Sequence, residues 1–254
     1  MVERLSRRRL LGAGVLGTGG ILLSACDKLN GSAPVRALLE SAEDAHRVSQ
    51  RLITGGALAP EFAAKDMSPD FRANGSRTAA GNSVWDGHLA SGFSRWQLRV
   101  DGLVLHPLDL SLEALKALPQ RSQITRHDCV EGWSAIGAWQ GPQLGAILKA
   151  AVLLPAARFI VFHCADRLGG QPYYESIDLF DAFHPQTILA HTMNGAPLKV
   201  EHGAPVRMRV ERQLGYKQAK YVMRIEARST LAGLYDGKGG YWEDHSDYAW
   251  YAGI

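Results

Sequence analysis

The amino-acid sequence predicts an α+β fold in which mixed β-sheets are joined by short helices. Several short stretches alternate apolar and polar residues, as half-buried strands do, and the helical patterns between them span only a few turns. Strand and helix patterns do not alternate regularly along the chain, and no internal repeat occurs. A doubly wound parallel sheet is therefore not expected, because it is built from successive βαβ units.

The part of the chain before residue 86 is loosely patterned. A helix is expected over residues 35–52, where apolar residues recur at helical spacing. A turn-rich stretch runs over residues 74–87. We therefore expect a tether, one helix and irregular chain before the regular part begins.

From residue 95 the secondary-structure signals become sharper. Ser111 has the side chain of a helix N-cap, and Pro119 ends the short helix expected between them. Asn194-Gly195 is the strongest hairpin signal, because both residue types tolerate positive φ. Further strands are expected around Leu98 and over residues 159–164, 206–211 and 221–226, with a helix around Ile147. Because apolar and charged residues alternate over 206–211, that strand is expected to be half-buried.

The N-terminus is predicted to be an export signal. A basic pair, Arg7 and Arg8, precedes an apolar, Gly-rich stretch, which is the layout of a twin-arginine signal peptide over residues 1–25. Cys26 then follows small residues as in a bacterial lipobox, where the cysteine is acylated. A retained anchor or an ordinary secretory signal is the alternative. The expected location is the periplasm, with a membrane anchor if Cys26 carries lipid.

The charge balance excludes one class of partner. Of 28 basic and 25 acidic residues, four arginines and one glutamate lie in residues 1–25, so the rest of the chain is neutral. A neutral chain without basic stripes has no electrostatic reason to bind nucleic acid, and no such partner is expected.

Apart from Cys26, the chain has two cysteines, Cys129 and Cys164, and the residues around them allow three interpretations. They form a disulfide, as an oxidising compartment favours. Together with His127 and His163 they bind zinc, although no Cys-x-x-Cys spacing supports this. In the third, Cys129 is a lone thiolate ligand of a transition metal, with its pKa lowered by Arg126 and His127. Composition does not decide among them.

Four motifs occur around and after Cys129. They are QITRHDCVEGWSAIGAWQGPQLGAIL at 123–148, YYESI at 173–177, HGAPVR at 202–207 and GYKQAK at 215–220. In this order they resemble the motifs of the sulfite oxidase family, most closely those of its haem-free bacterial members, which include a periplasmic methionine sulfoxide reductase catalytic subunit. The resemblance covers roughly residues 71–228.

This resemblance implies a molybdenum–molybdopterin cofactor, whose dithiolene leaves one further soft ligand for the protein to supply. Cys129 matches the family's metal ligand, and with it the disulfide becomes the weaker alternative. Arg207 and Lys220 match residues that bind the pterin phosphate. Tyr173 matches an active-site tyrosine, and Tyr174 takes its place if the register shifts by one. The full cofactor-binding set that the resemblance implies is Asn74, Cys129, Cys164, His202, Arg207, Gln218, Ala219 and Lys220.

One departure from the family bears on the substrate. Sulfite-oxidising members have Phe-x-Arg-Asn, whose arginine binds the sulfite anion, where this chain has Phe71-Arg72-Ala73-Asn74. Ala73 takes the place of that arginine, and the adjacent Arg72 cannot be assumed to replace it. The sequence therefore favours reduction of an S- or N-oxide, with oxidation of sulfite or a similar small molecule as the alternative.

The resemblance also predicts how electrons reach the site. The sequence has no haem-binding Cys-x-x-Cys-His and no cysteine set for an iron–sulfur cluster, so no haem is expected in this chain. A membrane cytochrome b or a cytochrome c is the expected electron partner, by analogy with the family. The predicted layout is a signal peptide (1–25), a tether with a helix (26–70) and a catalytic domain (71–254).

An aromatic tail over residues 241–251 completes that domain. We expect an extended segment that covers the domain's own core, with a site-covering or partner-docking role as the alternative. A non-catalytic lipoprotein that binds a partner through this tail is the rival from another functional class. Retention of Cys129 together with the anion-binding residues speaks against that rival, because a pure binding module needs neither.

Overall fold

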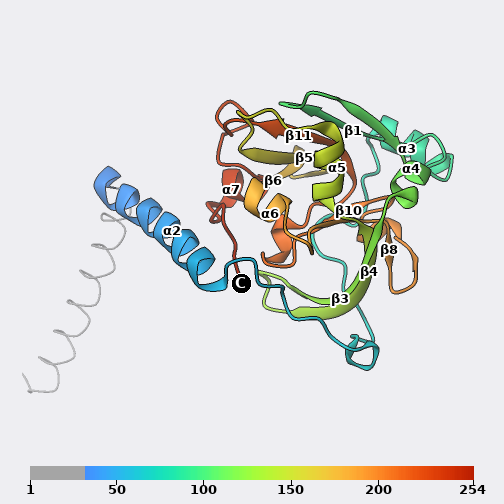
Figure 1. Ribbon diagram of the computed structural model, residues 1–254, viewed down its shortest axis with the longest axis horizontal. Coiled ribbons are helices and arrows are strands. Elements are labelled where there is room, and N and C mark those ends of the chain that lie inside the picture. Colours follow the sequence, from blue (N-terminus) through green and yellow to red (C-terminus); the bar gives the residue numbers. More distant parts are fainter. Residues whose placement is uncertain (1–31) are drawn as a thin grey trace, which may run out of the picture. The chain divides into compact units, whose positions relative to one another are not determined.

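The structure, a computed structural model, describes residues 32–254 and divides into two units after Gly55 (Figure 1). The predicted signal peptide and Cys26 lie outside the described residues. In the first unit, helix α2 (Ala33–Thr54) has a proline in its first turn, where the missing N–H is harmless, and ends at Gly55 with φ of 51°. This confirms the helix expected over residues 35–52 and extends it at both ends.

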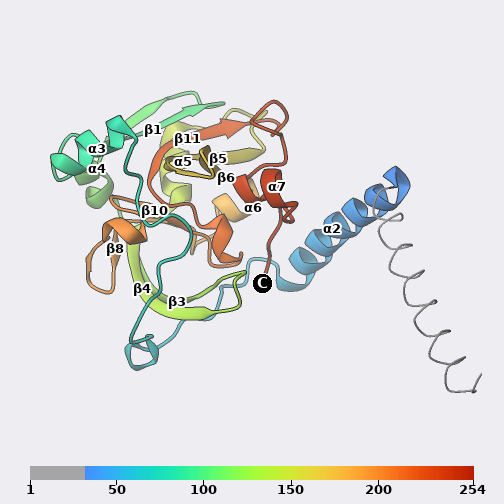
Figure 2. The same cartoon turned by 180° about the vertical axis from the view of Figure 1, so that it is seen from behind.

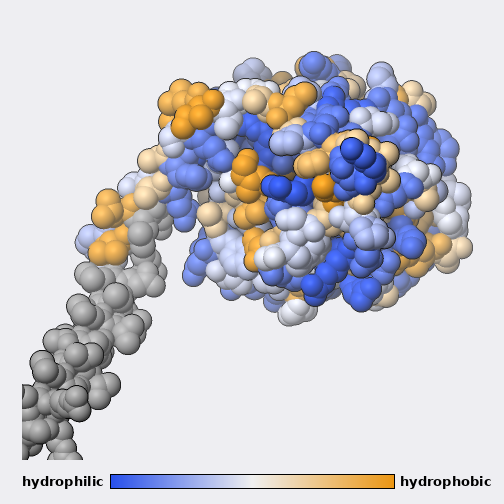
Figure 3. Space-filling view, turned by 90° about the horizontal axis from the view of Figure 1, so that it is seen from below, coloured by the Kyte–Doolittle hydropathy of each residue, from blue (hydrophilic) through white to orange (hydrophobic). Residues whose placement is uncertain are grey.

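Helix α2 exposes several large hydrophobic side chains. In Figure 3 hydrophobic residues are visible along the stretch that follows the grey segment. They include Leu38, Val48, Leu52 and Ile53, each at least half exposed. Between residues 32 and 254, no helix combines the length and the apolar character that crossing a bilayer would need.

The second unit is built on a five-stranded sheet with strand order β2-β1-β11-β5-β6. Strands β1 and β11 pair in parallel, and the other neighbours pair antiparallel, so the sheet is mixed as predicted. Its core side chains include Leu98, Ile160 and Ile225, and helix α5 adds Ile147 and Leu148. The bounds are β1 (Gln97–Gly102), β2 (Leu108–Ser111), β5 (Phe159–Leu168), β6 (Gln171–Asp178), β11 (Val222–Arg228) and α5 (Leu144–Ala151).

Two smaller sheets complete the unit. A four-stranded antiparallel sheet has the order β3-β4-β8-β9, and β7 pairs with β10. Figures 1 and 2 show the β3–β4 hairpin on the side of this unit opposite β1 and β11. Asn194 and Gly195 form the predicted turn between β8 and β9, with φ of 50° and 79°. The bounds are β3 (Gln120–Asp128), β4 (Ser134–Pro142), β7 (Ile188–Ala190), β8 (Thr192–Met193), β9 (Ala196–Pro197) and β10 (Arg207–Arg209).

Short helices connect the strands. Helix α4 begins where predicted, because the Ser111 side chain accepts a hydrogen bond from the backbone N–H of Ala114, and it ends before Pro119. The helix expected around Ile147 is α5. The bounds of the helical segments other than α2 and α5 are η1 (Ala64–Asp66), α3 (Ser83–Ala90), α4 (Leu112–Ala117), α6 (Leu179–Ala182), η2 (Val200–His202), η3 (Gly215–Lys217) and α7 (Tyr241–Ser246).

The strand predicted over residues 206–211 is present as β10, but the prediction that it is half-buried is wrong, because both of its faces are buried. Arg207 and Arg209 on β10 are 1% and 0% exposed. Their guanidinium carbons lie 5.1 and 4.3 Å from the centre of the Trp139 ring, and Arg209 forms an ion pair with Glu211. An alternating pattern normally indicates a solvated polar face, but aromatic and ionic partners here replace the solvent.

Three further expectations are corrected. The turn-rich stretch of residues 74–87 runs into helix α3, which Asn82 caps by accepting hydrogen bonds from the N–H groups of Val84 and Trp85. The aromatic tail does cover the domain's core, but residues 241–246 form helix α7 instead of extended chain. Residues 59–62, assigned above to the tether, hydrogen-bond to β3 and to Gln186.

Candidate active site

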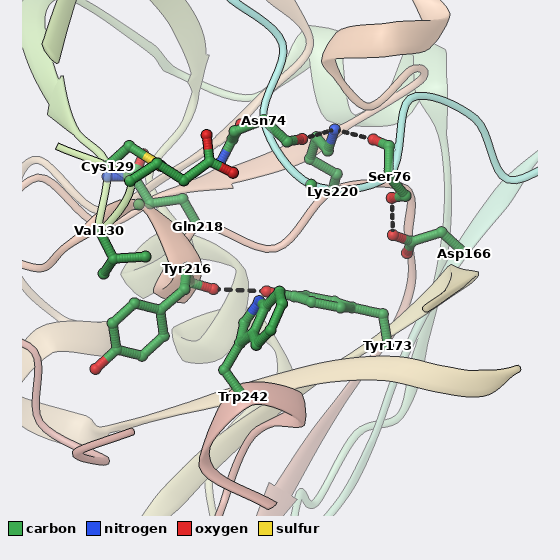
Figure 4. Close-up of a pocket in the computed structure, with 13 residues that line it drawn as sticks. Asn74, Ser76, Cys129, Val130, Asp166, Tyr173, Tyr216, Gln218, Lys220 and Trp242 are labelled. Carbon is green, nitrogen blue, oxygen red and sulfur yellow. Dashed lines mark hydrogen bonds between the residues drawn. The ribbon is translucent and has the colours of Figure 1, made fainter. Parts of the chain in front are cut away.

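A pocket of about 60 Å³ lies where five separate parts of the second unit meet (Figure 4). Its walls come from the segment after Phe71, the β3–β4 turn, strands β5 and β6, the chain around η3, and helix α7. Cys129 lies on one side of the pocket, with Tyr173 and Trp242 on the other. The other labelled lining residues are Asn74, Ser76, Val130, Asp166, Tyr216, Gln218 and Lys220.

Cys129 stands in the tight turn between β3 and β4. Its backbone N–H donates to the carbonyl of Trp133 (2.9 Å), and its own carbonyl accepts from Gly132 (3.0 Å). Gly132 has φ of 85°, which a glycine adopts without strain. Burial raises the pKa of the thiol, so the lowering expected from Arg126 and His127 is wrong; the backbone N–H groups of Glu131 and Val130 partly oppose the rise. The turn thus presents a single half-buried sulfur to the pocket.

Neither the disulfide nor the zinc site considered for the cysteines is formed. Cys129 and Cys164 are both free thiols, so the disulfide interpretation is wrong for this structure. Within residues 32–254 no three His, Cys, Asp or Glu side chains are grouped as a metal site, so the four-residue zinc site is also wrong. Cys164 is not among the lining residues of the pocket; its sulfur faces the carbonyl of Phe162 at 3.9 Å.

Next to the pocket lies a buried basic group made of His202, Arg207 and Lys220, which are 8%, 1% and 6% exposed. Lys220 is the member of this group that also lines the pocket. Arg207 donates to the carbonyls of His202 (3.2 Å) and Gln218 (3.4 Å), and it forms no ion pair with a carboxylate of the described chain. The Lys220 ammonium donates to the backbone carbonyls of Asn74 (2.6 Å), Glu201 (3.1 Å) and Ser76.

The pKa values of this group report an excess of buried positive charge. Burial and the neighbouring Arg209 lower the pKa of Arg207 to about 9. Burial and Arg207 lower the pKa of Lys220 to about 7 and that of His202 to about 4. Each shift disfavours the charged form of the side chain. An anion bound here would stabilise the charged forms and so offset the effect of burial.

Two buried polar atoms in this group are unused. Arg207 Nε and His202 Nδ1 have no hydrogen-bond partner in the described part of the chain. Buried polar atoms are normally paired, and an unpaired one in a site indicates a ligand or water. The donor set therefore fits a ligand that combines anionic and acceptor oxygens with a soft metal beside Cys129, as a molybdenum–pterin phosphate does.

Tyr173 and Tyr174 point in opposite directions, as successive residues of a strand must. Tyr173 lines the pocket, donates a hydrogen bond to the carbonyl of Tyr216 (2.8 Å) and stacks on Tyr241 (5.5 Å between ring centres). Burial raises its pKa, so the phenol keeps its proton. Tyr174 donates to Asp244 instead and does not line the pocket. Of the two tyrosines, only Tyr173 faces the pocket.

The structure brings most of the predicted residues to one place. Asn74, Cys129, Tyr173, Gln218 and Lys220 line the pocket, and His202 and Arg207 join it through the hydrogen bonds above. Ala219 is buried in the main core, and its carbonyl accepts from the N–H of Met208 (2.8 Å).

The lining residues that the sequence reasoning did not assign to the site include Ser76, Asp166, Tyr216 and Trp242. Asp166 accepts a hydrogen bond from Ser76, and burial raises its pKa to about 6. The sequence offered one usable signal, the aromatic cluster that contains Trp242. No pattern linked Ser76 to Asp166, because they lie 90 residues apart.

The structure also shows where Arg72 lies relative to the pocket, and so whether it replaces the arginine for which Ala73 stands. Arg72 is exposed and its guanidinium carbon lies 5.8 Å from the centre of the Trp133 ring. It lines a neighbouring polar cavity, which shares Asn74, Gly75 and Glu131 with the Cys129 pocket, and it does not line the Cys129 pocket itself. Arg72 therefore acts on the Cys129 thiol from beside the pocket, where its charge lowers the thiol pKa, and is not one of the pocket's lining residues.

Residues 74–233 match the family described as the oxidoreductase molybdopterin binding domain, and this match covers more than half of the chain. The chain belongs to this molybdenum-enzyme family, the sulfite oxidase family. Family membership confirms the predicted fold class and identifies residues 74–233 as an oxidoreductase molybdopterin binding domain.

Two curated relatives of the chain are described as methionine sulfoxide reductase subunits. The chain is 40% identical over 158 residues to a putative protein-methionine-sulfoxide reductase subunit YedZ1 of Azospira oryzae, covering 62% of this chain and 56% of the relative. It is 36% identical over 143 residues to the protein-methionine-sulfoxide reductase catalytic subunit MsrP of Xanthomonas campestris pv. campestris, covering 52% and 44%. The chain thus spans about half the length of the curated relatives it matches.

A solved structure resembles the fold of this chain. The sulfane dehydrogenase SoxCD of Paracoccus pantotrophus gives a TM-score of 0.50 at 19% identity, covering 69% of this chain and 46% of that chain. At this identity the likeness concerns the fold alone.

Proposed function

We propose that this chain reduces S- or N-oxides in the periplasm with a molybdenum–molybdopterin cofactor. One observation carries the proposal: the single Cys129 thiol faces a pocket next to two buried cations, Arg207 and Lys220, that form no ion pair with a carboxylate within residues 32–254. Both halves of the cofactor then have a matching group. The thiol is a soft ligand for the metal, and the buried cations are hydrogen-bond donors for the phosphate.

The residues that would hold the cofactor follow from their chemistry. Cys129 would ligate molybdenum. Arg207, with its unpartnered Nε, and Lys220 would bind the phosphate, and His202 would accept or donate through Nδ1. The proposed set is completed by Asn74, Gln218, the backbone of Ala219, and Cys164, which lies outside the pocket lining. When bound, the cofactor supplies a two-electron centre that accepts an oxygen atom.

The substrate step needs two electrons and two protons, because a sulfoxide that takes them up gives a thioether and one water. Tyr173 is the residue placed to act on the oxide. Its phenol stays protonated and is held at the pocket wall, so it can donate a hydrogen bond to an oxide oxygen in place of the Tyr216 carbonyl. Trp242 and Tyr216 line the same side of the pocket, and their side chains limit access of water to it.

Two observations favour reduction over sulfite oxidation. The Cys129 pocket lacks the arginine that sulfite-oxidising members use, since Ala73 stands at that position and Arg72 lines another cavity. The relatives named above are described as methionine sulfoxide reductase subunits. A membrane cytochrome b or a cytochrome c is the proposed electron donor, and a twin-arginine signal with lipid on Cys26 the proposed route and anchor.

The first experiment measures molybdenum and pterin in the full chain expressed in a bacterial host that makes the cofactor, for wild type and Cys129→Ser. Ser122→Ala, at an exposed residue of β3, is the control. We expect about one molybdenum per chain in wild type and control and none in Cys129→Ser. Folded wild-type protein without molybdenum or pterin would overturn the proposal.

The second experiment determines the direction of the reaction. Reduced viologen is combined with dimethyl sulfoxide, methionine sulfoxide or trimethylamine N-oxide, and ferricyanide is combined with sulfite. We expect turnover in the first set. Turnover with sulfite alone would reverse the assigned direction while leaving the cofactor assignment intact.

A further inference from the structure

An ion cluster without solvent access lies next to the pocket. The Lys217 ammonium is 2.7 Å from a carboxylate oxygen of Glu175 and also hydrogen-bonds to Glu243. The side chains of all three residues are at most 1% exposed. Neither the motif resemblance nor the proposed chemistry assigns a role to this Lys217 cluster.

Each member of the Lys217 cluster comes from a different segment of the pocket wall. Glu175 is on β6, two residues after Tyr173 and therefore on the same face of the strand. Lys217 directly follows Tyr216 in η3, and Glu243 directly follows Trp242 in α7. The three aromatic residues that line the pocket are thus each within two residues of one charged group of the cluster.

The contacts around the cluster show how closely these segments are joined. Glu175 and Gly240 form an isolated β-bridge, and a Cβ at Gly240 would lie 2.5 Å from Glu175 Oε2 and closer still to the Glu243 carboxylate. Only glycine therefore permits the carboxylates to reach Lys217 at this point. Ser176 on the same strand donates to the carbonyl of Gly239 and accepts from the Trp250 ring N–H (2.8 Å).

The charges in the cluster are unequal. One ammonium faces two carboxylates, and burial together with the neighbouring Glu243 raises the pKa of Glu175 well above its usual range. Burying such a group without solvent is unfavourable unless its geometry is kept, and removing one partner leaves an uncompensated charge. The cluster therefore acts as a strict restraint on the relative positions of β6, η3 and α7.

We propose that Lys217, Glu175 and Glu243 are positioning residues that fix Tyr173, Tyr216 and Trp242 as the substrate-facing wall of the pocket. Cofactor retention belongs to other residues, since the Lys217 ammonium is already paired with two buried carboxylates and, unlike Arg207, is not left to bind an anion. The cluster controls how well the substrate is held. For its kinetic part this inference rests on the proposed function, but its structural part does not.

The test uses the full chain with its cofactor and compares Lys217→Met, Glu243→Gln and the double variant Lys217→Met/Glu243→Gln. Lys149→Met, at an exposed lysine of α5, is the matched control. The first readout is backbone hydrogen exchange in residues 241–254. The N–H groups of Asp244 and Ile254 are hydrogen-bonded there to the carbonyls of Gly240 and Arg212. The second readout is KM and kcat with dimethyl sulfoxide and reduced viologen.

For Lys217→Met we expect exchange in residues 241–254 to rise about tenfold or more, because two carboxylates lose their shared ammonium. We expect KM to rise at least about fivefold, with kcat within about twofold and molybdenum content unchanged. The double variant, which leaves one carboxylate able to hold a proton, should recover most of the exchange protection. Lys149→Met should match wild type.

Unchanged exchange in residues 241–254 of Lys217→Met would overturn the inference. So would a fall in kcat with no change in KM, or a loss of molybdenum, because each places the cluster outside substrate positioning. If Lys217→Met does not fold, Glu243→Gln answers the same question, since it keeps the Lys217–Glu175 ion pair and should loosen only α7. If wild type reduces no S-oxide, the proposed function fails while the exchange readout still tests the cluster.

Discussion

The Tyr173 hydroxyl donates a 2.8 Å hydrogen bond to the backbone carbonyl of Tyr216, and this bond joins β6 to η3 and the GYKQAK motif. The bond is buried, so removing the hydroxyl takes one hydrogen-bond donor away from this carbonyl in a place that solvent does not reach. For Tyr173→Phe we expect the free energy of unfolding to fall by about 1–2 kcal/mol.

The same variant tests the role of the phenol. We expect kcat to fall by roughly 10- to 100-fold in the viologen assay, at unchanged molybdenum content. Tyr174→Phe is the matched control, because it removes the hydrogen bond to Asp244 on the other face of β6 and should leave kcat unchanged. Loss of kcat in Tyr174→Phe instead would exchange the two assignments.

Arg207 and Arg209 are adjacent on the same face of β10, yet we expect opposite behaviour in cofactor-free protein. Arg207 has no carboxylate partner in the described chain, so Arg207→Met should change the free energy of unfolding by no more than about 1 kcal/mol. Arg209→Met leaves the buried Glu211 uncompensated and should destabilise by about 3 kcal/mol or more.

Denaturant unfolding of both variants, each purified without cofactor, measures this difference. In cells that make the cofactor, Arg207→Met should in addition retain less pterin than wild type. Equal destabilisation by the two substitutions would show that Arg207 stabilises the fold through its carbonyl and ring contacts, and would remove it as an anion site.

His202 should make the stability of cofactor-free protein sensitive to acid. Its folded-state pKa is lowered to about 4, so between pH 4 and about 6.5 the unfolded chain binds more protons than the folded chain. Stability from this residue is therefore complete above pH 6.5 and is lost as the pH falls toward 4.

His202→Asn keeps a polar side chain that does not titrate in this range. We expect the difference in free energy of unfolding between pH 7 and pH 4.5 to shrink by up to about 2 kcal/mol in this variant. Urea titrations at several pH values measure it. An identical pH dependence in both proteins would assign the acid sensitivity to the other buried histidines.

Gly215 is placed where its lack of a side chain makes room for His127. A Cβ on Gly215 would lie 2.5 Å from both Cε1 and Nε2 of the His127 ring, which is itself fully buried. Gly215→Ala should therefore lower the free energy of unfolding by about 1–3 kcal/mol and disturb the pocket floor.

Gly87→Ala is the matched control for this substitution. It lies in helix α3 with open space around the added methyl, and should stabilise by up to about 1 kcal/mol. Thermal unfolding of the two alanine variants compares them directly. A harmless Gly215→Ala would mean that the His127 ring is free to move.

Local patterns were enough to predict most of the regular elements. The Ser111 cap, the Asn194-Gly195 hairpin and the helix around Ile147 each depend on residues close in sequence, and each was found. The burial of Arg207 could not be predicted in this way. Its partners, the ring of Trp139 and two backbone carbonyls, come together only through tertiary packing.

The site was predictable to the extent that its residues stand in motifs. Cys129, Tyr173 and Lys220 were found because short motifs carry them, although the residue that each contacts was not visible in the sequence. The Lys217 cluster had no such signal, because Glu175 and Glu243 lie 42 and 26 residues from Lys217 and look like ordinary surface charges. Charge compensation at long sequence separation leaves no local periodicity.

Because the pocket wall includes both Asn74 and Trp242, it closes over chain segments that a ribosome produces far apart in time. While residue 242 is still in the exit tunnel, a nascent chain has the Cys129 turn but lacks one side of the pocket. We therefore expect cofactor capture to follow translation of this whole stretch, so a stalled or shortened polypeptide would present a thiol without an enclosed site.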